Sequence, residues 1–178
     1  MSKLCQIYRV KDWFNKDTLK LIIESLVLSK LFYCSSVWAN TSDSNIKKLQ
    51  LVQNFAVRII TGARKFDHTT PHLHELEWLP VKDRLRYRDL LMMFKCLNDM
   101  SPGYLSTKSS TRSSIHDRET RNRNDLDIPI FKTSSGQRTF KFRATKLWND
   151  LDNNFKNISS YNILKKQLKL YMVSNILS

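Results

Sequence analysis

The stretch from Ser42 to Gly62 restricts the fold most strongly, because its apolar residues recur with the period of an α-helix. At about 100° per residue, one broad arc of this helix is apolar and the band opposite is polar and basic. The apolar arc holds Ile46, Leu49, Val52, Ala56, Val57, Ile59 and Ile60. The band opposite holds Lys47, Asn54 and Arg58. The pattern therefore predicts a core helix with a basic outer edge.

Two residues of this helix carry specific structural predictions. Gln53 falls in the middle of the apolar arc, and a buried amide is costly unless it is hydrogen-bonded, so we expect it to bond a neighbouring backbone group. Gly62 is expected to end the helix in the left-handed conformation. Arg64 and Lys65 follow at a helix C-terminus, where cations are favoured.

Other segments also show helical spacing or helix-boundary residues. Asp17 is a suitable N-cap, Thr70 before Pro71 is typical of a helix start, and Pro80 is expected to begin the helix after Trp78. The predicted helices cover residues 18–39, 70–78, 80–99, 140–151 and 160–174.

Basic residues recur on two of these predicted helical segments. Arg84, Arg88 and Lys95 lie within about 40° of one another on one helix. From Lys132 onward, nine Lys or Arg stand against two acids, and Arg138, Lys141 and Arg143 alternate with aromatic residues. Such a mixture can hold a phosphate backbone while rings stack on bases, or the aromatics can be core. We expect Trp148 to be core and at least some of the basic side chains to contact phosphate.

The charge balance points to a polyanionic partner. The chain has 178 residues, and its 30 Lys and Arg against 16 Asp and Glu give a formal net charge of +14. Nucleic acid is the first candidate partner and an anionic membrane surface the second. We expect no membrane-spanning helix, no signal peptide and an intracellular, cytoplasmic or nuclear location. Cys5, Cys34 and Cys96 are scattered through apolar runs, so we expect reduced, buried thiols.

The fold class predicted from these patterns is all-α, in four segments. Residues 1–16 are an N-terminal remnant, and residues 17–105 form a helical bundle. Residues 106–127 lack apolar periodicity and are expected to be a mobile polar linker, because they cannot bury enough surface to offset their ordering entropy. Residues 128–178 form a smaller basic helical unit.

Residue patterns that carry catalysis are sparse, so we expect no enzyme activity, no metal and no cofactor. Two-metal phosphoryl transfer needs clustered carboxylates, and the close pairs at 117/119 and 125/127 fall in the expected linker. His72 and His74 would lie about 200° apart on a helix, which disfavours a metal site with His68 and Glu75. The chain has only three glycines, and no glycine-rich phosphate loop is present.

Five ordered blocks carry a resemblance to a known family: LFYCSSVW, QNFAVRIITG, HELEWLPV, FKCLNDMSPGYL and LWNDL. Together they resemble the region behind the polymerase palm in reverse transcriptases of LINE-type (non-LTR) retrotransposons of the jockey and chicken-repeat clades. The resemblance covers residues 17–172 and implies the thumb and helical tail of an RNA-directed DNA polymerase.

That resemblance implies structural or primer-template-facing roles for several residues and catalytic roles for none. They are Gln53, Asn54, Arg58, Trp78, Leu79 and Pro80. The family's palm carries metal-binding aspartates in a Tyr-x-Asp-Asp hairpin, and this chain contains no Asp-Asp pair. The proline usual after the Leu-Trp-Asn-x-Leu block is Asp152 here. The parent protein's palm is therefore an expected partner.

Three functional hypotheses follow. The first is a noncatalytic module that grips the backbone of RNA or an RNA–DNA duplex without reading bases. The second is a helical protein-interaction module or a partly folded retroelement remnant, whose apolar faces once packed on the palm. The third, an independent polymerase or nuclease, requires metal-dependent turnover, which we do not expect.

Overall fold

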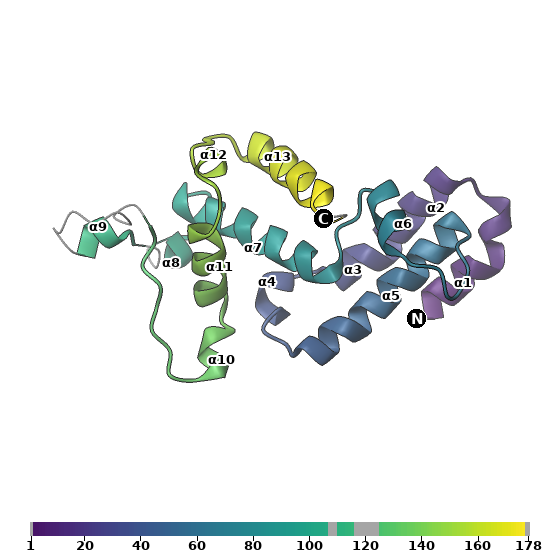
Figure 1. Ribbon diagram of the computed structural model, residues 1–178, viewed down its shortest axis with the longest axis horizontal. Helices are drawn as coiled ribbons and strands as arrows, with labels where there is room; N and C mark the ends of the chain where they lie inside the picture. The colour runs from purple at the N-terminus through teal and green to yellow at the C-terminus, as the bar shows by residue number, and fades with distance from the viewer. Residues whose placement is uncertain (1, 107–109, 116–124, 177–178) are drawn as a thin grey trace. The chain divides into compact units, whose positions relative to one another are not determined.

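The computed structural model describes residues 2–106, 110–115 and 125–176 (Figure 1). Within these ranges every regular element is a helix, and one isolated antiparallel bridge pairs Thr111 with Leu126. The predicted all-α class is confirmed. None of the helices in the described ranges has the length and apolar character needed to cross a membrane.

The chain divides into two compact units. Unit 1 comprises Met1–Ser35, Thr41–Leu85 and Tyr171–Ser178, and unit 2 comprises Ser36–Asn40 and Arg86–Leu170. One boundary between the two units falls between Leu85 and Arg86, inside the continuous helix α7 (Val81–Leu97). None of the four segments expected from the sequence has a boundary at this point.

Unit 1 is organised around α5 (Asp43–Thr61). The helices α1 (Ser2–Val10), α2 (Lys16–Ile23) and α6 (Thr70–Glu75) each contact it, as Figure 1 shows. The predicted core helix is confirmed, and its apolar arc supplies Ala56, Val57, Ile59 and Ile60 to the buried core. Gly62 ends it with φ 74, the left-handed conformation expected of this residue.

The single helix predicted over residues 18–39 is wrong in its start and in its continuity. Asn15 is the N-cap in place of Asp17, because its Oδ1 accepts a hydrogen bond from the Thr18 N–H at 2.8 Å. Cys34 then takes a left-handed φ of 46, which breaks the helical path. The segment is divided into α2, a π-helical turn η2 (Glu24–Leu28), α3 (Ser29–Leu31) and α4 (Ser35–Trp38).

Serine hydroxyls accompany the irregular part of this segment. Ser25 Oγ donates to the Ile22 carbonyl at 3.1 Å, and Ser29 Oγ donates to the Ser25 carbonyl. A serine hydroxyl that donates to a carbonyl one turn earlier competes with the backbone N–H for that acceptor, and it often bends the helix. Upstream, η1 (Lys11–Trp13) connects α1 to α2.

The helix α6 is shorter than predicted. α6 ends at Glu75 and not at Trp78, because Glu77 adopts a left-handed φ of 54 and the Trp78 N–H returns to the Leu73 carbonyl at 2.8 Å. Pro80 lies directly before α7, and its carbonyl accepts the Arg84 N–H at 2.8 Å. The helix α7 therefore begins at Val81, one residue after the predicted start at Pro80.

Unit 2 packs around the second half of α7. Phe94 is buried, with its ring centroid 6.3 Å from that of Trp148 and 6.3 Å from that of Tyr161. These rings come from α11 (Phe140–Asn149) and α13 (Tyr161–Ser174), which agree with the helices predicted at 140–151 and 160–174. The remaining elements are α8 (Gly103–Ser106), α9 (Arg112–Ile115), α10 (Ser134–Gln137) and α12 (Asn153–Lys156).

The segment predicted as a mobile linker, 106–127, lies partly outside the described residues, which exclude 107–109 and 116–124. Its described parts are tied to the core of unit 2. Leu126 is 3% exposed, and both its backbone groups bond the Asn149 side chain, at 3.0 Å and 2.9 Å. The prediction missed this anchor because Asn149 lies 23 residues further along the chain.

The cysteine prediction is wrong for two of the three thiols. Cys96 is buried, whereas Cys5 and Cys34 are exposed. All three are free thiols.

Candidate nucleic-acid interface

A network of side-chain amides on α5 fixes the segment between α6 and α7. Gln53 is 1% exposed, and its Nε2 donates to the Leu79 carbonyl at 2.9 Å, which confirms the bond expected of it. Gln50 Oε1 accepts the Val81 N–H at 2.8 Å, a donor at the first turn of α7 that has no intrahelical partner. Gln53 is therefore a structural residue that ties α5 to the Leu79–Val81 backbone.

Asn54 belongs to the same network. Gln50 Nε2 donates to Asn54 Oδ1 at 2.8 Å and to Gln53 Oε1 at 3.0 Å. Asn54 was predicted to contact nucleic acid. Its side-chain oxygen is instead bonded to Gln50 within the protein. Trp78, predicted as structural, is 6% exposed and donates from Nε1 to Glu24 Oε1 at 2.7 Å.

Arg58 shapes the loop that follows α5. Its Nε donates to the Arg64 carbonyl at 3.1 Å, and a terminal nitrogen donates to the Asp67 carbonyl at 3.4 Å. The loop is closed by the Arg64 N–H, which donates to Asp67 Oδ2 at 2.7 Å. The structure therefore brings together Arg58, Arg64 and Lys65, and the last two are exposed.

Lys47 lies near the other end of α5. Arg58 lies eleven positions further along the chain, which is about 16 Å along a helix axis, and the two share one face. Its exposed ammonium group has no hydrogen bond or ion pair with the described residues. Lys47 and the loop that Arg58 contacts thus lie at the two ends of one basic edge of unit 1, as the sequence pattern predicted.

Two lysines that the sequence analysis did not single out come together in unit 1. Lys3 on α1 and Lys30 on α3 are both exposed. Lys30 lowers the pKa of Lys3, first through a side-chain hydrogen bond and then through charge repulsion, with desolvation a smaller cause. Two neighbouring ammonium groups favour an anion beside them. No local pattern could have found the pair, because its members lie on separate helices.

The second basic stripe, on α7, is packed against aromatic rings. The guanidinium carbon of Arg84 lies 5.7 Å from the Phe32 ring centroid, in unit 1. Lys95 Nζ lies 4.6 Å from the Tyr161 ring centroid, in unit 2. Arg88, between them in sequence, is half-buried as they are. These cation–π contacts hold the aliphatic parts of the Arg84 and Lys95 side chains against the rings, and both side chains keep their positive charge.

Arg143 has a different role from the predicted phosphate contact. Its Nε and a terminal nitrogen donate to Asp89 Oδ2 at 3.2 Å and 3.0 Å. The same guanidinium donates to the carbonyls of Ser36, at 3.4 Å, and Arg138. Asp89 is 2% exposed, and burial raises the pKa of its carboxyl while Arg143 opposes that rise. We therefore assign Arg143 to the fold of unit 2 and not to the interface.

Other cations of unit 2 remain at its surface. Arg138 is exposed and Lys141 is half-buried, and neither charged group has a hydrogen-bond or ion-pair partner within the described ranges. Trp148 is 8% exposed, which agrees with the prediction that it is core. Further exposed lysines of this unit are Lys132, Lys146, Lys165 and Lys166.

The histidine segment forms ordinary surface pairs. His72 Nδ1 lies 3.4 Å from Glu75 Oε2, and Lys16 Nζ lies 3.7 Å from Glu75 Oε1. In the described part of the chain no group of three or more His, Cys, Asp or Glu is placed to hold a metal ion.

Comparison with known proteins yields no relative. No family model, no curated protein and no solved structure matches the chain.

Proposed function

We propose that the chain is a noncatalytic nucleic-acid-binding protein that grips the sugar-phosphate backbone of RNA or an RNA–DNA duplex. The resemblance to the thumb and tail of LINE-type reverse transcriptases suggests a primer-template as the duplex. Backbone contact without base readout needs only cations held at the spacing of phosphates, and the affinity it gives falls with salt.

The observation that carries the proposal is the formal net charge of +14 together with the placement of the cations. Lys47, Arg64 and Lys65 lie on or beside α5 with exposed side chains. Lys3 and Lys30 are close enough that the pKa of Lys3 is lowered. Self-repulsion of this kind disfavours the compact state, and a bound polyanion relieves it.

The proposal is tested with fluorescence anisotropy on a labelled 20-base-pair RNA–DNA duplex. We expect Lys47→Gln to weaken binding roughly threefold and to reduce the salt slope by about one, as the loss of one phosphate contact does. Lys47→Arg is the matched control, because it keeps the charge, and it should bind as the wild type does. Equal duplex affinity of Lys47→Gln and Lys47→Arg would show that Lys47 does not contact a phosphate. Failure of the wild-type chain to bind any duplex would refute the proposed function.

A second candidate function is a helical protein-interaction module. Leu21 on α2, Leu26 on η2 and Leu51 on α5 are large apolar residues with exposed side chains. Light scattering and circular dichroism distinguish this candidate from the first. A chain that self-associates, or that binds no RNA but gains helix when a polymerase palm is supplied as a separate polypeptide, favours it.

A further inference from the structure

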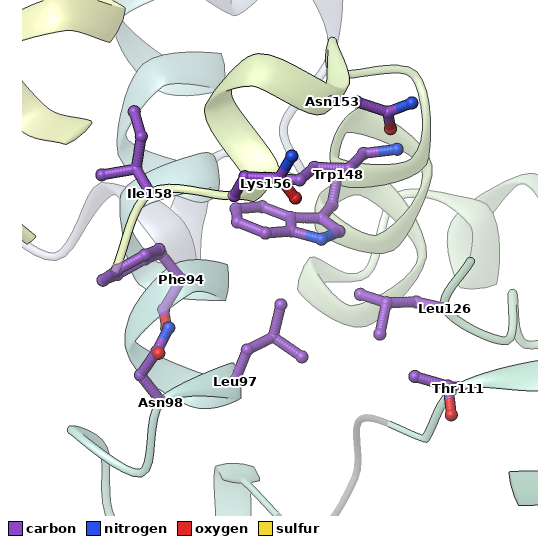
Figure 2. A pocket seen from close by; sticks show the side chains of 10 residues that line it. Phe94, Leu97, Asn98, Thr111, Leu126, Trp148, Asn153, Lys156 and Ile158 are labelled. Atoms are coloured by element: carbon purple, nitrogen blue, oxygen red, sulfur yellow. The ribbon is translucent and has the colours of Figure 1, made fainter. Parts of the chain in front are cut away.

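Unit 2 contains a half-open cavity of about 500 Å³ at the end of α7. Its walls come from α7, α11, the Thr111–Leu126 bridge and α12, so segments distant in sequence enclose one space. Figure 2 shows the Trp148 side chain between Phe94 and Leu97 on one side and Leu126 and Thr111 on the other.

The apolar walls of this cavity are held in place by packing and hydrogen bonds. Phe94 is 1% exposed and contacts the Trp148 ring. Leu126 is fixed through the two hydrogen bonds between its backbone and the Asn149 side chain. Binding to preformed aromatic walls costs little ordering of the protein.

The rim of the cavity is built from amides. Asn98, Asn153 and Asn157 line it, and all three are exposed. Asn98 Nδ2 donates to the Phe94 carbonyl at 2.9 Å, and its Oδ1 remains an acceptor. The side chains of Asn153 and Asn157 have no hydrogen-bond partner within the described ranges. Each free amide offers two donors and an acceptor.

One charged side chain, that of Lys156, is found among the described residues that line the cavity. Its Nζ donates to the Asn149 carbonyl at 2.8 Å and lies 3.8 Å from Asp125 Oδ1, so its ammonium group is held at the rim. Because Asp125 pairs with this ammonium group, the rim beside it is close to neutral and suits a neutral ligand.

We propose that this cavity receives one unpaired nucleobase of a bound RNA strand. A base has flat faces that can pack on the accessible part of Trp148 and on Leu97, and an edge of donors and acceptors that amide side chains match. Its phosphate would remain outside, on the Lys156 side. The volume lies within the range of sites that take small ligands, about 300–1,000 Å³. This inference rests on the proposed function and adds a base-binding subsite to backbone contact.

The test compares two single-stranded RNA oligomers of equal length, one with normal bases and one with abasic sites. We expect the normal oligomer to bind roughly tenfold more tightly, since stacking of one base contributes on that order. Asn153→Ala with Asn157→Ala should reduce that preference several-fold and leave binding of the abasic oligomer unchanged. Asn154→Ala is the matched control, because Asn154 lies on the same short helix and does not line the cavity.

The outcomes separate the two proposals. Equal affinity for both oligomers, or no affinity for either, overturns the base subsite and leaves duplex-backbone binding intact, whereas failure to bind the oligomers and the RNA–DNA duplex alike overturns the proposed function itself. A direct second measurement is NMR titration of the wild-type chain with adenosine 5′-monophosphate. Shifts confined to the side-chain amides of Asn98, Asn153 and Asn157 support the subsite. Unchanged amides, or shifts produced only by an apolar peptide, refute it.

Discussion

The ion pair between Asp89 and Arg143 gives the sharpest prediction about the fold. Arg143→Met keeps an unbranched apolar stem and removes the guanidinium charge, which leaves a buried carboxylate without its partner. Breaking a buried pair in this way costs about 3–5 kcal/mol. Because the Arg143 side chain is 19% exposed and that of Asp89 is 3% exposed, we expect a value near the lower end, about 3 kcal/mol. For a chain of this size that lowers the Tm by roughly 6–12 °C.

The cost of Arg143→Met depends on pH. Burial raises the pKa of Asp89 in the folded protein, and Arg143 opposes the rise. A carboxyl whose pKa is raised by folding contributes stability that is present below its unfolded pKa and is lost as pH rises through its folded pKa. The variant lacks the opposing charge, so its Asp89 pKa rises further. The difference in unfolding free energy between wild type and variant should therefore be small near pH 4 and grow toward pH 7.

Urea unfolding followed by circular dichroism at the two pH values measures this difference. Asp89→Asn combined with Arg143→Met should be less destabilising at pH 7 than Arg143→Met alone, because no buried charge remains. Arg138→Met is the control, since the Arg138 side chain is exposed and should change stability little. An equal loss for Arg143→Met at both pH values, or a loss no larger than that of Arg138→Met, would refute the reasoning.

Three further predictions concern single residues of unit 1 and one glycine of unit 2. Gln53→Met should cost about 1–3 kcal/mol in urea unfolding, because it leaves a buried backbone carbonyl unpaired, and a loss below 0.5 kcal/mol would contradict the amide network. Gly62→Ala should lower the free energy of unfolding by about 1 kcal/mol through the positive φ alone, because an added Cβ meets nothing within 4 Å. Gly103→Ala is the control, and in a helix it should be neutral or stabilising. Lys30→Gln should return the pKa of Lys3 toward its ordinary value by NMR titration and weaken duplex binding without lowering the Tm; an unchanged pKa would show that the two ammonium groups do not interact.

Local periodicity was sufficient to predict several elements. The apolar arc from Ile46 to Ile60 predicts α5 with its buried face, and the lone amide within that arc predicts a buried hydrogen bond for Gln53. Gly62 was identifiable because a left-handed helix end favours glycine. In each case the residue type and its place on one helix decide the outcome.

Tertiary pairing decided the features that periodicity missed. Cys34 and Glu77 adopt left-handed conformations although neither residue type favours them, so the surrounding packing selects the break. Asp89 and Arg143 lie 54 residues apart, and a basic residue in an aromatic run gives no sign that its partner is a buried carboxylate.

The central claim is that the positive charge of this chain binds a nucleic-acid backbone, and the salt dependence of duplex affinity tests it most directly. Anisotropy titrations of wild-type protein between 50 and 200 mM KCl give the slope of log affinity against log salt. With four to six phosphates contacted, we expect affinity to fall by a factor of roughly 10²–10³ over this range. Affinity that stays constant across the same range would contradict the account.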